Sequence, residues 1–328
     1  MRNEKRGRNK SFSLSYAIKK SKIGALEISF GWLFAIVAGI VIIFLAIYLS
    51  SKIINTEQET KSAETGKEIE ILLNPLETSF ESAQTTSITI PVETRINNIC
   101  ELTGTFGRQT IHLDQKSFNK WTETNVKVFF YNKYIFSEEE IQGKQFYIFS
   151  KPLKFPFKVA DLIFMTSSEN RYCFIESPEE IEEEIANLNQ KNILVENCSD
   201  NDIKVCFNDE DCEINVDYLS GIIEKNSNIS YFDVGDDALM YAGIFSSKEV
   251  YECQLKRIMN RIEELSNLYS NKEIILKKEN NVEINLAGDL NQLREVAGIF
   301  NGSKDIGIVK SQAEKLGEKN DIGVWQLW

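Results

Sequence analysis

The sequence predicts an α+β protein with a single N-terminal transmembrane helix, a stalk and one mixed domain. Residues 28–49, ISFGWLFAIVAGIVIIFLAIYL, contain no charged side chain. Residues 86–165 contain runs rich in β-branched and aromatic residues, and from Arg171 onward strand and helix patterns alternate. We therefore expect a domain whose first half is antiparallel and β-rich and whose second half is α/β, with a sub-boundary near 166–170.

The apolar segment is long enough to span a membrane, because about 20 helical residues cover about 30 Å of hydrocarbon. Residues 1–22 carry eight basic residues and one acidic residue, a balance of +7. Positive charge next to a span stays in the cytoplasm. We predict a basic cytoplasmic leader at 1–24, a transmembrane helix at 25–49 and an extracytoplasmic remainder. A cleaved secretory signal is the alternative, but its apolar region is usually shorter, about 7–15 residues.

Small residues recur on one face of this helix. Gly31, Ala35 and Gly39 are spaced by four, and Glu27 lies one step earlier on the same face. Such a stripe lets a second helix approach closely. We expect membrane lipid around the helix, and this face as a packing surface for another copy of the chain or another membrane helix.

The bounds of the stalk and of the folded domain are predicted from the polar residues after the membrane segment and from Pro75. Residues 50–68 are mostly polar, so we predict a solvated stalk that continues the helix and frays towards Gly66. Pro75 should break the helix, and the folded domain is predicted at 69–328.

In the second half, residues 171–197 predict a strand, a helix and a strand, which is a small βαβ unit. Residues 203–207 and 212–216 flank an acidic turn and predict a hairpin whose strands carry Cys206 and Cys212.

The strongest helix of the domain is predicted after residue 246. Ser246 and Glu249 are spaced as a capping box, and apolar residues then repeat every three or four positions up to Tyr269. Cys253 lies near the edge of that stripe, where it could link the helix to a strand. The apolar C-terminus, DIGVWQLW, should dock on the domain.

Cysteine content and charge limit the class of protein. The net charge of −12 includes the +7 leader, so the remainder carries −19, which argues against a nucleic-acid partner. All six cysteines lie beyond the membrane segment, which suggests up to three disulfides. The pair Cys206 and Cys212 is the strongest expectation, and free buried thiols are the alternative for the whole set: Cys100, Cys173, Cys198, Cys206, Cys212 and Cys253.

The sequence offers little for catalysis. It has one histidine, His112, and no nucleophile-elbow, phosphate-loop, dinucleotide-binding or zinc-protease motif, so we expect no enzyme, metal or cofactor. The best carboxylate cluster is Asp233, Asp236 and Asp237 around Gly235. A turn followed by a helix N-cap is the simpler interpretation of those residues.

One family resemblance concerns the entry to the membrane. Residues 22–27 read Lys-Ile-Gly-Ala-Leu-Glu, a basic leader that ends in glycine before an apolar helix. About 30 of the 328 residues thus resemble the class III signal of type IV pilin-like proteins and tight-adherence pseudopilins. The resemblance implies cleavage between Gly24 and Ala25 and a role in assembly for Glu27. Glu27 would be the third mature residue, whereas bacterial pilins usually have this glutamate at the fifth.

These observations together favour a single-pass, membrane-anchored, extracytoplasmic protein that acts in surface binding or assembly. The alternatives are a pilin-like minor subunit processed after Gly24 and an extracytoplasmic carboxylate-based hydrolase. The sequence does not identify a ligand of the outer domain.

Overall fold

The computed structural model describes residues 30–73, 84–117, 120–207, 212–280, 285–323 and 325–328. Their contacts group residues 55–328 into one compact unit. The elements in chain order are α1 (Phe30–Leu73), β1 (Gln84–Glu101), β2 (Arg108–Ser117), β3 (Lys120–Phe130), β4 (Tyr134–Phe136), β5 (Glu140–Lys154), β6 (Lys158–Ser167), β7 (Tyr172–Ile175), α2 (Glu179–Leu188), β8 (Ile193–Val195), β9 (Ile203–Cys206), β10 (Ile214–Asp217), β11 (Ile222–Lys225), β12 (Asn228–Tyr231), α3 (Asp237–Phe245), α4 (Lys248–Asn280), α5 (Ala287–Gly298), the 3-10 helix η2 (Ser303–Asp305) and α6 (Ile306–Ile322). The chain is thus mixed α+β, as predicted.

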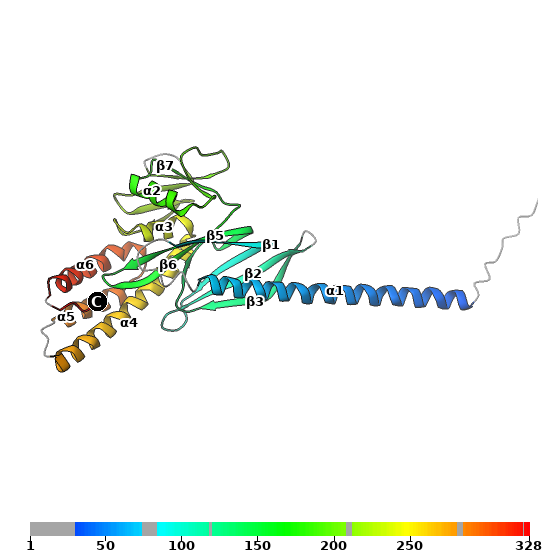
Figure 1. The fold of residues 1–328 in the computed structure, drawn as a ribbon, viewed down its shortest axis with the longest axis horizontal. Helices are drawn as coiled ribbons and strands as arrows, with labels where there is room; N and C mark the ends of the chain where they lie inside the picture. Colours follow the sequence, from blue (N-terminus) through cyan, green and yellow to red (C-terminus); the bar gives the residue numbers. More distant parts are fainter. Residues whose placement is uncertain (1–29, 74–83, 118–119, 208–211, 281–284, 324) are drawn as a thin grey trace, which may run out of the picture. The chain divides into compact units, whose positions relative to one another are not determined.

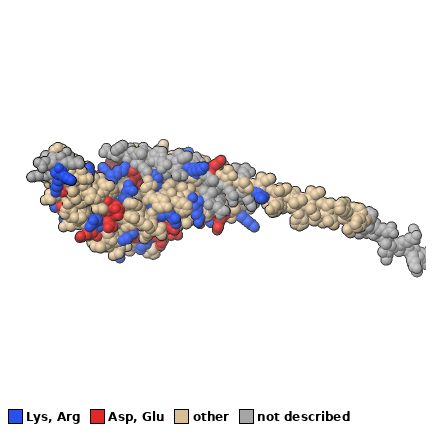
Figure 2. Space-filling model, turned by 90° about the horizontal axis from the view of Figure 1, so that it is seen from below, with Lys and Arg blue, Asp and Glu red and all other residues tan. Residues whose placement is uncertain are grey.

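Helix α1 runs without a break for 44 residues. Among the described residues, Phe30–Ile54 is the one segment long and apolar enough to cross a membrane. Figure 2 shows its first part as a run without charged side chains. The expected fraying near Gly66 is wrong, because the helix continues to Leu73; a single glycine costs a helix only about 1 kcal/mol. The predicted helix break at Pro75 lies outside the described residues.

The first sheet is built from the β-rich half of the domain. Its strand order is β3-β2-β1-β5-β6-β4, and its pairs are antiparallel apart from the parallel pair of β4 with β6. Alternate residues of β1, such as Ile88, Ile90 and Ile96, are buried, because successive side chains of a strand point to opposite faces. The expected antiparallel pairing of this half is confirmed.

The second sheet has the order β12-β11-β10-β9-β7-β8. Strands β7 and β8 are parallel and α2 connects them, so the predicted βαβ unit is confirmed. Helix α2 buries Ile181, Ile185 and Leu188, each of which contributes about 2 kcal/mol of hydrophobic stabilisation. The change from the first sheet to the second lies between Ser167 and Tyr172.

The predicted hairpin at residues 203–216 is wrong. Strands β9 and β10 pair in parallel, with Ile214 opposite Val205 and Asn215 opposite Cys206. A connection this short normally joins antiparallel strands, and that rule led to the prediction. Here β9 already pairs in parallel with β7, and β10 extends the same parallel run. The residues between the strands include 208–211, which lie outside the described part.

A continuous apolar core joins both sheets to the helices. Helix α3 is buried along its length and contacts β5 and β6 of the first sheet and β11 of the second. Figure 1 shows α4 beside the long strands of the first sheet, with α5 next to its C-terminal half and α6 packed on α5. The C-terminus docks as expected, since Leu327 is buried and the Trp328 ring packs edge-on to Phe157 at 5.5 Å between centroids.

The six cysteines form three disulfides: Cys100–Cys253, Cys173–Cys198 and Cys206–Cys212. The expected pair of Cys206 with Cys212 is therefore confirmed, although the strands that flank it are parallel. The expected link from Cys253 to a strand is also present, because Cys253 lies on α4 and Cys100 on β1.

Candidate functional site

The sequence of helix α4 explains where the helix begins and which of its faces is buried. The hydroxyl of Ser247 accepts a hydrogen bond from the backbone N–H of Val250 at 3.3 Å, so Ser247 caps the helix and not Ser246 as predicted. Ser246 instead donates to the carbonyl of Ala242 at the end of α3. The apolar stripe that begins at Tyr251 and includes Ile262 is buried against the sheets, which leaves the opposite face of α4 in solvent.

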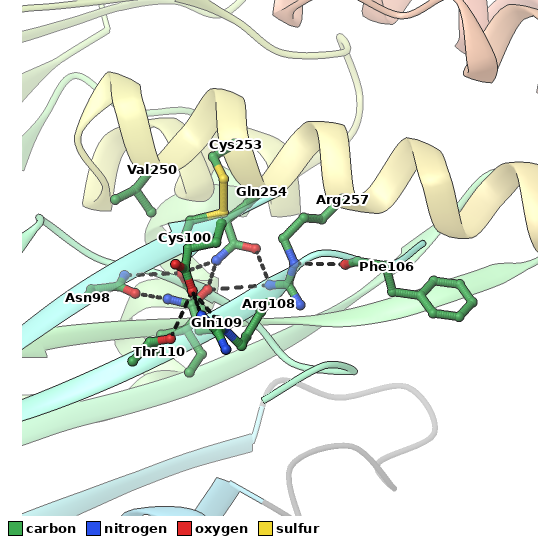
Figure 3. The surroundings of a disulfide bond; sticks show 12 residues. Asn98, Cys100, Phe106, Arg108, Gln109, Thr110, Val250, Cys253, Gln254 and Arg257 are labelled. Atoms are coloured by element: carbon green, nitrogen blue, oxygen red, sulfur yellow. Dashed lines mark hydrogen bonds and ion pairs between the residues drawn. A yellow bond between two sulfur atoms is a disulfide. The ribbon is translucent and has the colours of Figure 1, made fainter. Parts of the chain in front are cut away.

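A fully buried arginine holds α4 against the first sheet (Figure 3). Arg257 donates from Nε to the carbonyl of Phe106 at 3.0 Å, from Nη1 to the carbonyl of Lys133 at 2.9 Å, and from Nη2 to the carbonyl of Tyr131 at 3.1 Å. Its guanidinium carbon lies 4.9 Å from the centroid of the Tyr134 ring. Burial lowers the pKa of Arg257 to about 10, so the side chain still carries its charge at neutral pH.

Three amide side chains extend this network across β1 and β2. Gln254 accepts from Nη1 of Arg257 at 2.8 Å and donates to Gln109, which in turn donates to Asn98 (Figure 3). The side-chain amide of Asn98 donates to the hydroxyl of Ser137 at 2.7 Å. The network pairs buried donors and acceptors across several strands. It therefore fixes the position of α4 relative to the first sheet and to the loops that contain Phe106 and Tyr131.

An apolar groove lies beside this network. It encloses about 750 Å³ between Phe106 and one side of α4, and its apolar lining includes Leu265, Leu268, Ile275 and Leu276. The side chain of Leu268 is 57% exposed and that of Ile275 is 54% exposed. This face of α4 was not predicted from the sequence. Its signal is the pair of apolar residues Leu268 and Ile275, which are seven apart and out of phase with the buried stripe.

A second, polar pocket of about 610 Å³ lies over β1 and β2. Asn97 donates to Asp114 at 2.9 Å, and Nδ1 of His112 lies 3.7 Å from the other oxygen of the same carboxylate. Glu123, Glu139 and Glu249 add negative charge to its lining. Within the described ranges, no three His, Cys, Asp or Glu side chains are placed to hold a metal ion. The lining offers hydrogen-bonding groups and acidic side chains, and it also contains the basic residue Arg95.

The carboxylates around Gly235 have structural partners. Asp236 caps α3 by accepting from the N–H of Leu239 at 3.2 Å, which confirms the N-cap interpretation. Asp233 pairs with Lys310 at 2.6 Å, and Asp237 accepts from the hydroxyl of Tyr218 at 3.1 Å. Burial raises the pKa of Asp236 to about 6. Its neighbours have structural roles: Asp233 links the loop before α3 to α6, and Asp237 links α3 to the loop after β10.

The predicted membrane face is only partly described. Gly31 and Gly39 lie on α1, and beyond the adjoining helix backbone and chain neighbours, no described atom lies within 4 Å of a Cβ built on either glycine. Ala35 is exposed on the same helix. The predicted processing residues Gly24 and Ala25 lie outside the described residues, and so does Glu27.

Comparisons with protein-family models, with curated proteins and with solved structures gave no significant match to this chain.

Proposed function

We propose that this chain is a single-pass membrane protein whose disulfide-bonded domain lies outside the cytoplasm and binds a partner protein during assembly at the cell surface. The basic leader and the apolar helix support the anchor and its orientation. The pairing of all six cysteines supports an oxidising compartment for the domain, since stable disulfides are rare in the cytosol.

The groove on α4 is the observation that carries the binding proposal. A helix that packs one face on the core usually presents charged and polar side chains to water on the other. Here Leu268 and Ile275 are more than half exposed and lie beside Phe106, which is 39% exposed. Grouped apolar side chains on a surface are a common mark of protein interfaces. Arg257 binds the backbone carbonyl of Phe106, which lines the groove, and so holds this side of the groove in place before binding.

Site-specific photo-crosslinking in living cells tests this proposal. A photoreactive amino acid in place of Leu268 should give discrete protein adducts on a denaturing gel. The matched control replaces Leu219, which is 87% exposed in the loop after β10, and should give none. Adducts of equal yield at both positions, or lipid adducts alone at position 268, would overturn the proposal.

The finer proposal, that the chain is a pilin-like subunit, depends on the membrane helix. The open face at Gly31, Ala35 and Gly39 favours it, because small residues allow the close helix packing on which such assembly depends. Processing after Gly24 would place the new amine near Glu27 of a neighbouring subunit, where low dielectric makes an unpaired carboxylate costly. The N-terminal sequence of the membrane-extracted protein tests this proposal directly.

A further inference from the structure

The solvent face of α4 carries more apolar surface than the groove alone. Leu268, Ile274 and Ile275 are exposed by 57%, 58% and 54%, and they lie about 100° to 140° around the helix from the centre of the buried stripe at Ile258 and Ile262. At 100° per residue, these three side chains span about 120° of the helix surface. That width matches the stripe by which a helix packs against a partner element.

Three polar residues on this face are equally spaced, with an acid and a base on either side of a central asparagine. Glu264, Asn271 and Lys278 are spaced by seven, or about two helical turns, so they share one face with Leu268 and Ile275. All three are exposed. Within the described part of the chain, neither Glu264 nor Lys278 forms an ion pair, whereas the neighbouring Lys277 pairs with Glu273 at 2.6 Å. The face therefore presents an acid at one end, an amide at its centre and a base at the other end.

This arrangement is complementary to itself when two helices run antiparallel. A two-fold axis through Asn271 places each residue opposite the one equally far on the other side of the axis. Glu264 of each copy then faces Lys278 of the other, and Leu268 packs against Ile275 of the other copy, because these two residues share one flank of the face. A parallel arrangement would instead place Glu264 against Glu264 and Lys278 against Lys278, which is repulsive.

The same face fits a lipid surface less well. An interfacial helix keeps its acidic and amide groups on the polar side, away from the acyl chains. On α4, Glu264 and Asn271 lie within the apolar face, so lipid contact would desolvate both without a partner. A second copy supplies those partners: Lys278 for Glu264 and the symmetry-related Asn271 for Asn271.

We propose that this face of α4 binds the same face of a second copy of the chain, as an antiparallel pair centred on Asn271. The proposal rests on the proposed function, in which α4 is a protein-binding surface, and it names the partner. Anchoring in one membrane raises the effective concentration of the copies, so a modest interface is sufficient for pairing.

A cysteine at the symmetry axis tests the geometry in the full-length, membrane-anchored protein. Asn271→Cys places two thiols opposite each other and should give a covalent dimer on a non-reducing gel that reduction removes. The matched control is Asn291→Cys, an exposed asparagine on α5, which should stay monomeric. A monomeric Asn271→Cys protein, or equal dimer from both variants, overturns the pairing.

Charge exchange in the Asn271→Cys background tests the register. Glu264→Lys and Lys278→Glu should each lower the cross-linked fraction, because two attractive pairs become repulsive; we expect about tenfold weaker pairing. The double variant restores both pairs and should recover cross-linking, which also shows that each change leaves the domain folded. Failure of the double variant to recover rejects the antiparallel register. Protein adducts at Leu268 of a mass other than a dimer would reject the second copy and leave the proposed function standing, whereas lipid adducts alone would reject both.

Discussion

The disulfide between Cys100 and Cys253 should contribute most to stability, because it closes the longest loop. The two residues are 153 apart in the sequence, against 25 for Cys173–Cys198 and 6 for Cys206–Cys212. The chain-entropy relation then gives about 5, 3.5 and 2 kcal/mol for the three bonds. The two short bonds lie within the long loop, but this hardly lowers the first value, since the cost grows with the logarithm of loop length.

Three paired cysteine-to-alanine variants measure this order directly. Urea titration of the full chain in a mild detergent, followed by near-ultraviolet circular dichroism, gives the free energy of unfolding of each. The Cys100→Ala/Cys253→Ala protein should lose about 3 kcal/mol more than the Cys206→Ala/Cys212→Ala protein. Equal losses, or the reverse order, would refute the loop-closure argument and place the stabilisation in local packing.

Further predictions concern the buried polar groups and the membrane segment. Arg257→Met leaves the carbonyls of Phe106, Tyr131 and Lys133 without their donor and should cost about 3–5 kcal/mol, which a thermal melt would show; an unchanged melt contradicts this. The raised pKa of Asp236 makes the folded state hold a proton longer than the unfolded chain, so stability should fall as pH rises from 4 to 6. Asp236→Asn, which keeps a capping oxygen, should abolish that fall; the same slope in both proteins contradicts it. Protease added to intact cells should remove the domain and spare an epitope placed in the leader, and protection of the domain would reverse the orientation. N-terminal sequencing should read Ala25 first if the chain is pilin-like, and an intact leader rejects that processing.

Local patterns were enough to predict the elements whose partners are close in sequence. The βαβ unit of β7, α2 and β8 was predictable because its helix has one clear apolar face and its strands lie within 27 residues. The antiparallel half was predictable because its strands follow one another without room for crossover helices. The parallel pairing of β9 and β10 was not, since strand direction here depends on β7, whose position no local pattern reports.

The site on α4 could not be predicted from the sequence, because it also depends on contacts between residues far apart in the chain. Arg257 contacts backbone groups of residues 106, 131 and 133, more than 120 positions away, and nothing near Arg257 in the sequence marks it as buried. A charged residue in an amphipathic helix is normally assigned to the solvent face. Leu268 and Ile275 raise the opposite problem, because apolar residues in such a helix are normally assigned to the core. A single periodicity along α4 therefore reports neither the buried arginine nor the exposed apolar side chains.

The nesting of the disulfides has a consequence for biosynthesis. The first cysteine of the chain pairs with the last, while the four between them pair in sequence order, Cys173 with Cys198 and Cys206 with Cys212. If the chain is exported from its N-terminus, Cys100 emerges first and meets Cys173 long before Cys253 is available. Its thiol must stay reduced, or be released from a wrong partner by thiol–disulfide exchange, until almost the whole domain has crossed the membrane. In an exported chain, oxidative folding therefore finishes at α4, and a chain that ends before Cys253 leaves Cys100 without its disulfide partner.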